Sequence, residues 1–136
     1  MTTSEKKVLI MCTGNSCRSI IGEALINKEL AGIKALSCGV MASGKVNENA
    51  KKVLEINNAW DDAYYSKDLD AVIHEDFDLV VTVCDHAKEQ CPLFPKSVKK
   101  IHVGFEDPDG KDFTVFEETY IQIYNELLKA VKEQLS

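Results

Sequence analysis

Residues 8–19 read VLIMCTGNSCRS, and the interpretation of the whole chain starts from this stretch. A short apolar run ends at Cys12, a loop with Gly14 and Asn15 follows, and a helical pattern begins near Ser19. This order predicts a buried strand, a tight loop and the N-terminus of a helix. Because free backbone N–H groups and the helix dipole both face such a loop, it is a natural anion site.

Two side chains give this loop its expected chemistry. The same field should stabilise the thiolate of Cys12, which would then be a nucleophile at neutral pH. Arg18 carries a planar, charged guanidinium that matches two oxygens of a tetrahedral oxyanion. Ser19 can either cap the helix or hydrogen-bond the thiolate, and Cys17 is expected to be a small buried residue. The alternative for Cys12 is an inert core cysteine at a strand end.

The length and composition restrict the class of protein. The 136 residues, 45% of them hydrophobic, suit one domain that spans residues 1–136. Sixteen basic against 22 acidic residues give a net charge of -6, which argues against a nucleic-acid partner. No run approaches the ~20 apolar residues of a membrane span, and residues 1–7 lack the core of a signal peptide. We therefore expect a cytoplasmic protein without a membrane partner.

The five cysteines are odd in number and irregularly spaced. In the expected cytoplasmic setting, this favours catalytic, redox or core thiols over a framework of structural disulfides.

Strand and helix patterns alternate along the chain. We expect strands at 7–11, 33–37, 78–83 and 99–103, and helices at 19–30, 47–57 and 67–73. Asn47 is the expected cap of the second helix, and residues 84–95 are expected to form a long loop. Thr114 and Glu117 have the capping-box spacing of a final helix, whose apolar stripe includes Tyr124. The alternation predicts a parallel α/β sheet.

Three segments with chemical potential follow expected strands. They are the loop at 12–19, the segment from Cys84 to Cys91, and the loop that holds Asp107. Because functional sites of parallel sheets lie at the carboxyl ends of the strands, these segments should converge.

The loop at 12–19, together with Asp107-Pro108 late in the chain, resembles the low-molecular-weight tyrosine phosphatase superfamily. The resemblance implies a four-stranded parallel sheet with helices on both faces. It also implies that Cys12 is the nucleophile, that Arg18 binds the oxyanion and that Asp107 is the general acid. The substrate-binding loop would then consist of Thr13, Gly14, Asn15, Ser16, Cys17 and Arg18.

Three further segments resemble the arsenate reductases built on this phosphatase fold. They are VCDHAKEQCP at 83–92, SCG at 37–39 and HVGFEDPDGK at 102–111. Reduction needs two electrons, and a pair of thiols that ends as a disulfide can supply them. Arsenate resembles phosphate in shape and charge, but thiols can reduce it.

The resemblance implies a relay of three cysteines. Cys12 attacks arsenic while Asp107 protonates the departing oxygen, and Ser19 supports the nucleophile. Cys84 then attacks the Cys12 sulfur and releases arsenite, and Cys91 attacks Cys84. An external thiol carrier must reduce the final disulfide; thioredoxin is favoured, with glutathione and glutaredoxin as the other source. Phosphate and sulfate would mimic the substrate, and no cofactor or metal is expected.

The spacing of Cys84 and Cys91 sets a condition on this relay. Seven residues of intact helix span about 10 Å, beyond the ~7 Å limit between the Cα atoms of a disulfide. If the segment is helical, it must at least partly unwind on oxidation.

Other interpretations remain open. Cys84, His86, Cys91 and His102 could bind zinc, although their spacing fits no common zinc pattern, and local hydrogen bonds are the simpler expectation for both histidines. If Cys84 and Cys91 are core thiols, the protein would be a phosphatase; a redox or metal sensor that uses this pair is a third class. Cys38 is expected to be a core thiol.

Two departures from the arsenate reductases concern other positions. Gly22 should weaken the first helix. Lys67 stands where some relatives carry an acidic ligand for potassium, so no required metal ion is expected.

Overall fold

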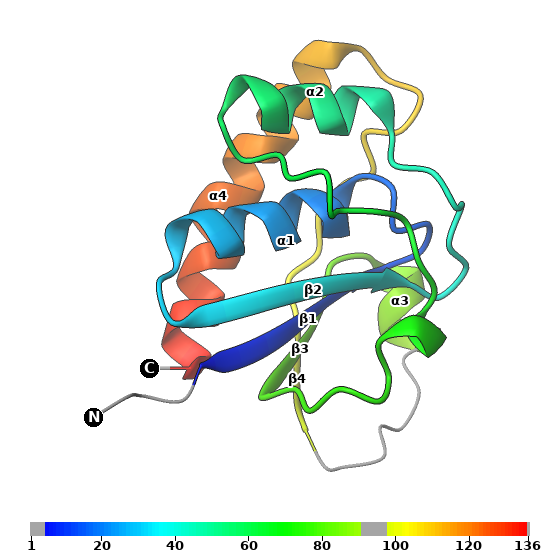
Figure 1. Cartoon of the computed structure of the whole chain (residues 1–136). Helices are drawn as coiled ribbons and strands as arrows, with labels where there is room; N and C mark the ends of the chain where they lie inside the picture. The colour runs from blue at the N-terminus through cyan, green and yellow to red at the C-terminus, as the bar shows by residue number, and fades with distance from the viewer. Residues whose placement is uncertain (1–4, 91–97, 136) are drawn as a thin grey trace.

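The computed structural model describes residues 5–90 and 98–135 and contains one parallel sheet (Figure 1). Its strand order is β2-β1-β3-β4. The strands are β1 (Lys6–Cys12), β2 (Ile33–Gly39), β3 (Leu79–Thr82) and β4 (Lys99–His102). All three pairings are parallel, so the predicted α/β fold class is confirmed.

Helices cover both faces of the sheet, as the resemblance implied. On one face, α1 (Arg18–Glu29), α2 (Glu48–Ile56) and α4 (Phe113–Leu135) pack on one another. The short η1 (Leu69–Ala71) and α3 (Asp85–Gln90) lie on the other side in Figure 1. The connections from β1 to β2 and from β3 to β4 run in opposite directions across the sheet. Because such crossovers are right-handed, they place α1 and α3 on opposite faces.

The core lies between the central strands and the three packed helices. Residues 8–11 of β1 and 79–81 of β3 are fully buried, which fits their apolar, β-branched composition. Gly22 of α1 lies where the helix meets its neighbours. A Cβ atom at this position would lie 2.8 Å from Leu127 Cδ2 and 3.3 Å from Ile10 Cγ2. Close packing of α1 against α4 and β1 therefore requires this glycine.

One expected helix is shorter than predicted, because only 69–71 of residues 67–73 are helical, as the 3-10 helix η1. Three further local expectations are wrong. The segment after Cys84 begins with α3 rather than with a loop. The final helix begins at Phe113, so Thr114 lies inside it and does not cap it. Tyr124 is 42% exposed, because Thr119, Ile123 and Leu127 form the buried face of α4. Asn47 does cap α2, since its side chain accepts the N–H groups of residues 49 and 50.

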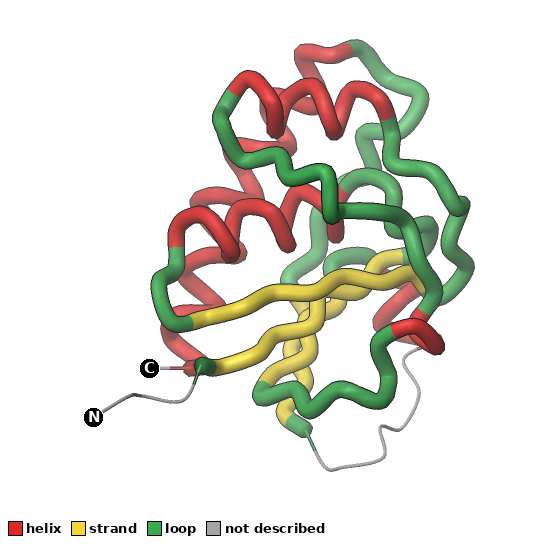
Figure 2. The backbone as a smooth tube through the Cα atoms, viewed as in Figure 1, coloured by secondary structure: helices red, strands yellow, loops and turns green. Residues whose placement is uncertain are grey.

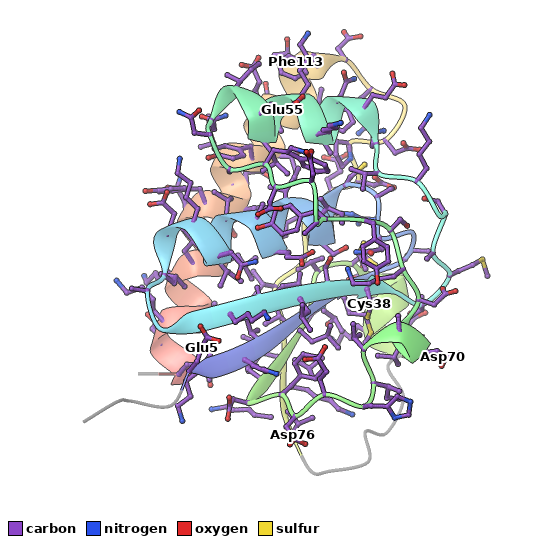
Figure 3. All side chains as sticks on the ribbon, in the orientation of Figure 1. Glu5, Cys38, Glu55, Asp70, Asp76 and Phe113 are labelled. Atoms are coloured by element: carbon purple, nitrogen blue, oxygen red, sulfur yellow. The ribbon has the colours of Figure 1, made fainter. Side chains whose placement is uncertain are left out.

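The carboxyl ends of the strands share one edge, and long loops gather there (Figure 2). Figure 3 shows Cys38 near the end of β2 and Asp70 of η1 at the same edge. Cys38 is fully buried, as expected for a core thiol. Among the described residues, no helix is both long enough and apolar enough to cross a membrane.

Candidate active site

The loop from Cys12 to Arg18 connects the end of β1 to α1. Asn15 has the left-handed backbone conformation (φ 48°), which asparagine tolerates better than most residues. Gly39 of β2 makes room for the loop, because a Cβ there would lie 2.5 Å from the Thr13 carbonyl oxygen. The segment that follows β2, residues 40–47, runs beside the loop and forms four backbone hydrogen bonds with it. The donors are the N–H groups of Val40, Met41, Ser43 and Asn47, and the acceptors are, in the same order, the carbonyls of Cys12, Thr13, Gly14 and Ser16. The loop is therefore held from outside along most of its length.

The side chain of Asn15 organises the interior of the loop. Its Oδ1 accepts the backbone N–H of Lys67 at 2.9 Å, so its Nδ2 must be the donor to Ser19 Oγ at 2.7 Å and to Ser37 Oγ at 2.9 Å. Ser19 Oγ lies 2.8 Å from Cys12 Sγ. Because Ser19 already accepts from Asn15, its own proton is free to point at the sulfur.

Ser19 consequently fills one of its two predicted roles. It lies inside α1, whose N-cap is Cys17, and it contacts the sulfur instead of capping the helix.

The electrostatics of Cys12 differ from the expectation of a stabilised thiolate. The side chain is 2% exposed, and burial raises the pKa of the thiol. The Ser19 hydroxyl, the backbone N–H groups of Ser19 and Asn15 and the charge of Arg18 lower the pKa, but they do not outweigh burial. The sequence revealed these donors, but it could not reveal how completely the fold excludes water from the sulfur.

Arg18 joins the loop to the segment after β4. Its Nη1 donates to the carbonyl oxygen of Phe105 at 3.0 Å, and its Nη2 lies 3.4 Å from Asp107 Oδ2. The Arg18 side chain is 11% exposed and that of Asp107 is 53% exposed. The guanidinium is thus fixed on one side, and the carboxyl that was predicted to be the general acid lies beside it.

Cys84 approaches from the end of β3. Its Sγ lies 3.2 Å from the Oγ1 of Thr13, the residue that follows Cys12. The same sulfur accepts the Ala87 N–H at 3.4 Å. A cavity of about 590 Å³ is lined by Thr13, Arg18, Cys84, Asp85, Gly104, Phe105, Glu106 and Asp107. Residues from all three expected segments therefore meet around one cavity. Cys91 lies outside the described residues.

The side chain of Cys17 is withdrawn from solvent and from the cavity lining. It is 3% exposed, and burial raises the pKa of its thiol to about 12. Its predicted place in the substrate-binding loop can therefore involve its backbone only.

A buried carboxyl supports the loop and was not predicted as a site residue. Glu23 of α1 is 3% exposed and accepts the Ser37 hydroxyl at 2.5 Å. Burial raises the pKa of Glu23 to about 6, although the nearby charge of Lys67 and the bond from Ser37 lower it. The Nζ of Lys67 donates to the Tyr65 carbonyl at 3.2 Å. The sequence signal for this buried carboxyl was a glutamate at a helix position that faces the core.

Metal ligands are not assembled in the described part of the chain. The side chain of His86, like Cys91, lies outside the described part of the structure. Among the described side chains of residues 5–90 and 98–135, no group of three or more His, Cys, Asp or Glu could hold an ion. His102 makes local hydrogen bonds, as expected, to Thr82 Oγ1 (2.8 Å) and Asp85 Oδ1 (3.2 Å).

Comparisons with known proteins agree with this geometry. The chain is 41% identical over 116 residues to arsenate reductase 1 of Bacillus cereus, which covers 84% of this chain and 85% of that protein. The crystal structure of arsenate reductase from Archaeoglobus fulgidus has a TM-score of 0.79 at 31% identity, covering 92% of this chain and 98% of that one.

A phosphatase has a similar fold. The tyrosine phosphatase Wzb from Escherichia coli K30, in complex with sulphate, gives a TM-score of 0.79 at 26% identity and covers 96% and 99% of the two chains. The family model described as low molecular weight phosphotyrosine protein phosphatase matches residues 7–136. With its parallel sheet and its cysteine–arginine loop, the chain belongs to the low-molecular-weight phosphotyrosine protein phosphatase family.

Proposed function

We propose that this protein is an enzyme that reduces arsenate to arsenite through a relay of three cysteines. The observation that carries the proposal is the position of Cys84, whose sulfur contacts Thr13 beside the nucleophile position. A phosphatase needs one thiol at this site, whereas a reductase needs a second thiol within reach. The relative at 41% identity that is named arsenate reductase supports this choice.

Binding comes first in this mechanism. Backbone N–H groups of the loop and the Arg18 guanidinium bind the arsenate oxygens. Burial raises the pKa of the Cys12 thiol. In the proposed step the thiol proton passes to an oxygen of the bound dianion as the sulfur attacks. The hydroxyl of Ser19 donates to the sulfur and holds the thiolate in place.

The first covalent step joins sulfur to arsenic. Cys12 attacks arsenic, and Asp107 gives its proton to the departing oxygen, which leaves as water. In the second step Cys84 attacks the Cys12 sulfur. A sulfur–sulfur bond forms, the sulfur–arsenic bond breaks, and its electron pair reduces As(V) to As(III), which leaves as arsenite.

Regeneration needs a third thiol and an external donor. Cys91 attacks Cys84 and frees Cys12, and a dithiol carrier reduces the Cys84–Cys91 disulfide. We assign thioredoxin this role, with glutathione and glutaredoxin as the other source. Such carriers keep thiols reduced in the cytoplasm, which is where we assign the protein.

Phosphate monoester hydrolysis through Cys12 is the second candidate. The family match and the Arg18–Asp107 pair favour it, because phosphate has the same shape and charge as arsenate and the same acid would protonate an ester oxygen. No role for Cys84 or Cys91 follows from that reaction.

Steady-state kinetics separate the two functions. Arsenate-dependent oxidation of thioredoxin, and of glutathione with glutaredoxin, is compared with the hydrolysis of p-nitrophenyl phosphate. We expect Cys12→Ser to abolish every activity and Cys84→Ala to abolish reduction only. Cys38→Ala, a buried thiol outside the relay, is the matched control and should retain reduction. If Cys84→Ala reduces arsenate at the wild-type rate, the relay is wrong.

A further inference from the structure

One imidazole holds the chain on both sides of Cys84. His102, the last residue of β4, lies with Nδ1 2.8 Å from Thr82 Oγ1 and with Nε2 3.2 Å from Asp85 Oδ1. Thr82 comes two residues before Cys84, and Asp85 comes directly after it. A neutral ring satisfies both contacts when the threonine hydroxyl donates to Nδ1 and Nε2–H donates to the carboxylate.

The packing around the ring is specific. His102 is 23% exposed, whereas the carboxyl that it meets is 91% exposed. A Cβ atom on Gly104 would lie 3.0 Å from His102 Nε2, so the glycine leaves space for the ring in this orientation. Because a contact to such an exposed carboxyl adds little to folding stability, replacing Asp85 should leave the fold intact.

Hydrogen bonds to a thiol sulfur are weak, and Cys84 has two of them among the described residues. Its sulfur lies 3.2 Å from the Thr13 hydroxyl and accepts the Ala87 N–H at 3.4 Å. Attack on Cys12 requires the two sulfur atoms to reach about 2.05 Å. The rate of that attack therefore depends on how firmly the surrounding backbone presents Cys84 to the loop.

We propose that His102 is a positioning residue for Cys84, acting through its bridge between Thr82 and Asp85. The inference rests on the proposed function, because it concerns the step in which Cys84 displaces arsenic from the Cys12 sulfur. His102 touches neither arsenate nor the reacting sulfur atoms in this account. Its loss slows the transfer between the two sulfurs and leaves oxyanion binding and the Cys12 nucleophile intact.

The test measures that transfer directly. In rapid-quench single turnovers with reduced protein, His102→Ala should slow arsenite release by about 5- to 10-fold, the effect of one or two ordinary hydrogen bonds. Asp85→Ala should slow it by a smaller factor, because its carboxyl is largely exposed. In His102→Ala the KM for arsenate and the rate of p-nitrophenyl phosphate hydrolysis should stay unchanged. Asp85→Asn, which can still accept from Nε2–H, should restore most of the rate. The double variant should be no slower than His102→Ala, because both act through one bridge.

His74→Ala, an exposed histidine distant in the chain, is the matched control. The inference is overturned if His102→Ala releases arsenite at the wild-type rate, or if its phosphate ester hydrolysis falls by the same factor. The second result would show a general structural defect.

A second measurement keeps the inference separate from arsenate chemistry. Dithionitrobenzoate converts Cys12 to a mixed disulfide in a Cys91→Ser background, and Cys84 expels the coloured thiolate as the Cys12–Cys84 disulfide forms. His102→Ala should slow this release by the same 5- to 10-fold. If wild type fails to reduce arsenate but this exchange still depends on His102, the proposed function fails and the positioning role stands. An exchange that does not depend on His102 refutes the role.

Discussion

Replacing Glu23 by glutamine tests the buried support beneath the loop. Burial raises the pKa of this carboxyl from 4.5 to about 6. At about 1.36 kcal/mol per pKa unit, the shift corresponds to roughly 2 kcal/mol. The folded protein binds this proton more tightly than the unfolded chain, so the group stabilises the fold fully below about pH 4.5. That contribution is lost as the pH rises through about 6.

Glutamine keeps an acceptor for Ser37 but has no charge to desolvate. The stability of Glu23→Gln relative to wild type should therefore increase by about 1.5 kcal/mol between pH 4.5 and pH 7. Urea unfolding at a series of pH values, with reductant present and Trp60 fluorescence as the signal, measures this difference. Glu29→Gln, an exposed residue at the end of the same helix, controls for the loss of one carboxylate. A stability difference that stays constant with pH, or that shrinks as the pH rises, would refute the reasoning.

Three other substitutions have defined outcomes. Asn15→Ala should be less stable than Asn15→Gly by about 1 kcal/mol in urea unfolding. Both variants lose the same hydrogen bonds, but only alanine is strained at φ 48°. Equal stabilities would contradict this. Gly22→Ala should lower the free energy of unfolding by about 1–2 kcal/mol, and with it the Tm, because the new Cβ would lie 2.8 Å from Leu127. A higher Tm would show that helix propensity dominates. Arg18→Lys should weaken competitive inhibition by phosphate about 10- to 100-fold, because lysine lacks the planar fork, and an unchanged inhibition constant would remove Arg18 from the oxyanion site.

Local signals predicted most of the fold. The apolar run that ends at Cys12, the Val-rich strand β3 and the cap at Asn47 are encoded in short stretches, and each element formed where its pattern indicated. Helix α3 escaped prediction because DHAKEQ has no apolar period. The buried face of α4 was also predicted incorrectly at Thr119. This polar residue can be buried because its hydroxyl donates to the Val115 carbonyl.

The site was predictable only in outline. Convergence of three loops follows from the rule for parallel sheets, and it brings Arg18 to Phe105, 87 residues away. The individual contacts depend on tertiary packing and have no local signature. Lys67 donates its backbone N–H to Asn15, which no side-chain motif can signal. The raised pKa of Cys12 is likewise a property of the completed fold, because it results from the exclusion of water.

In the proposed relay, electrons reach arsenate from Cys12 and Cys84. Reduced protein is mixed with excess arsenate without any carrier and quenched in acid, arsenite is quantified, and disulfides are mapped by mass spectrometry. We expect stoichiometric arsenite with a Cys84–Cys91 disulfide in wild type and a Cys12–Cys84 disulfide in Cys91→Ala. Arsenite produced without any disulfide that includes Cys84, or no arsenite at all, would contradict it.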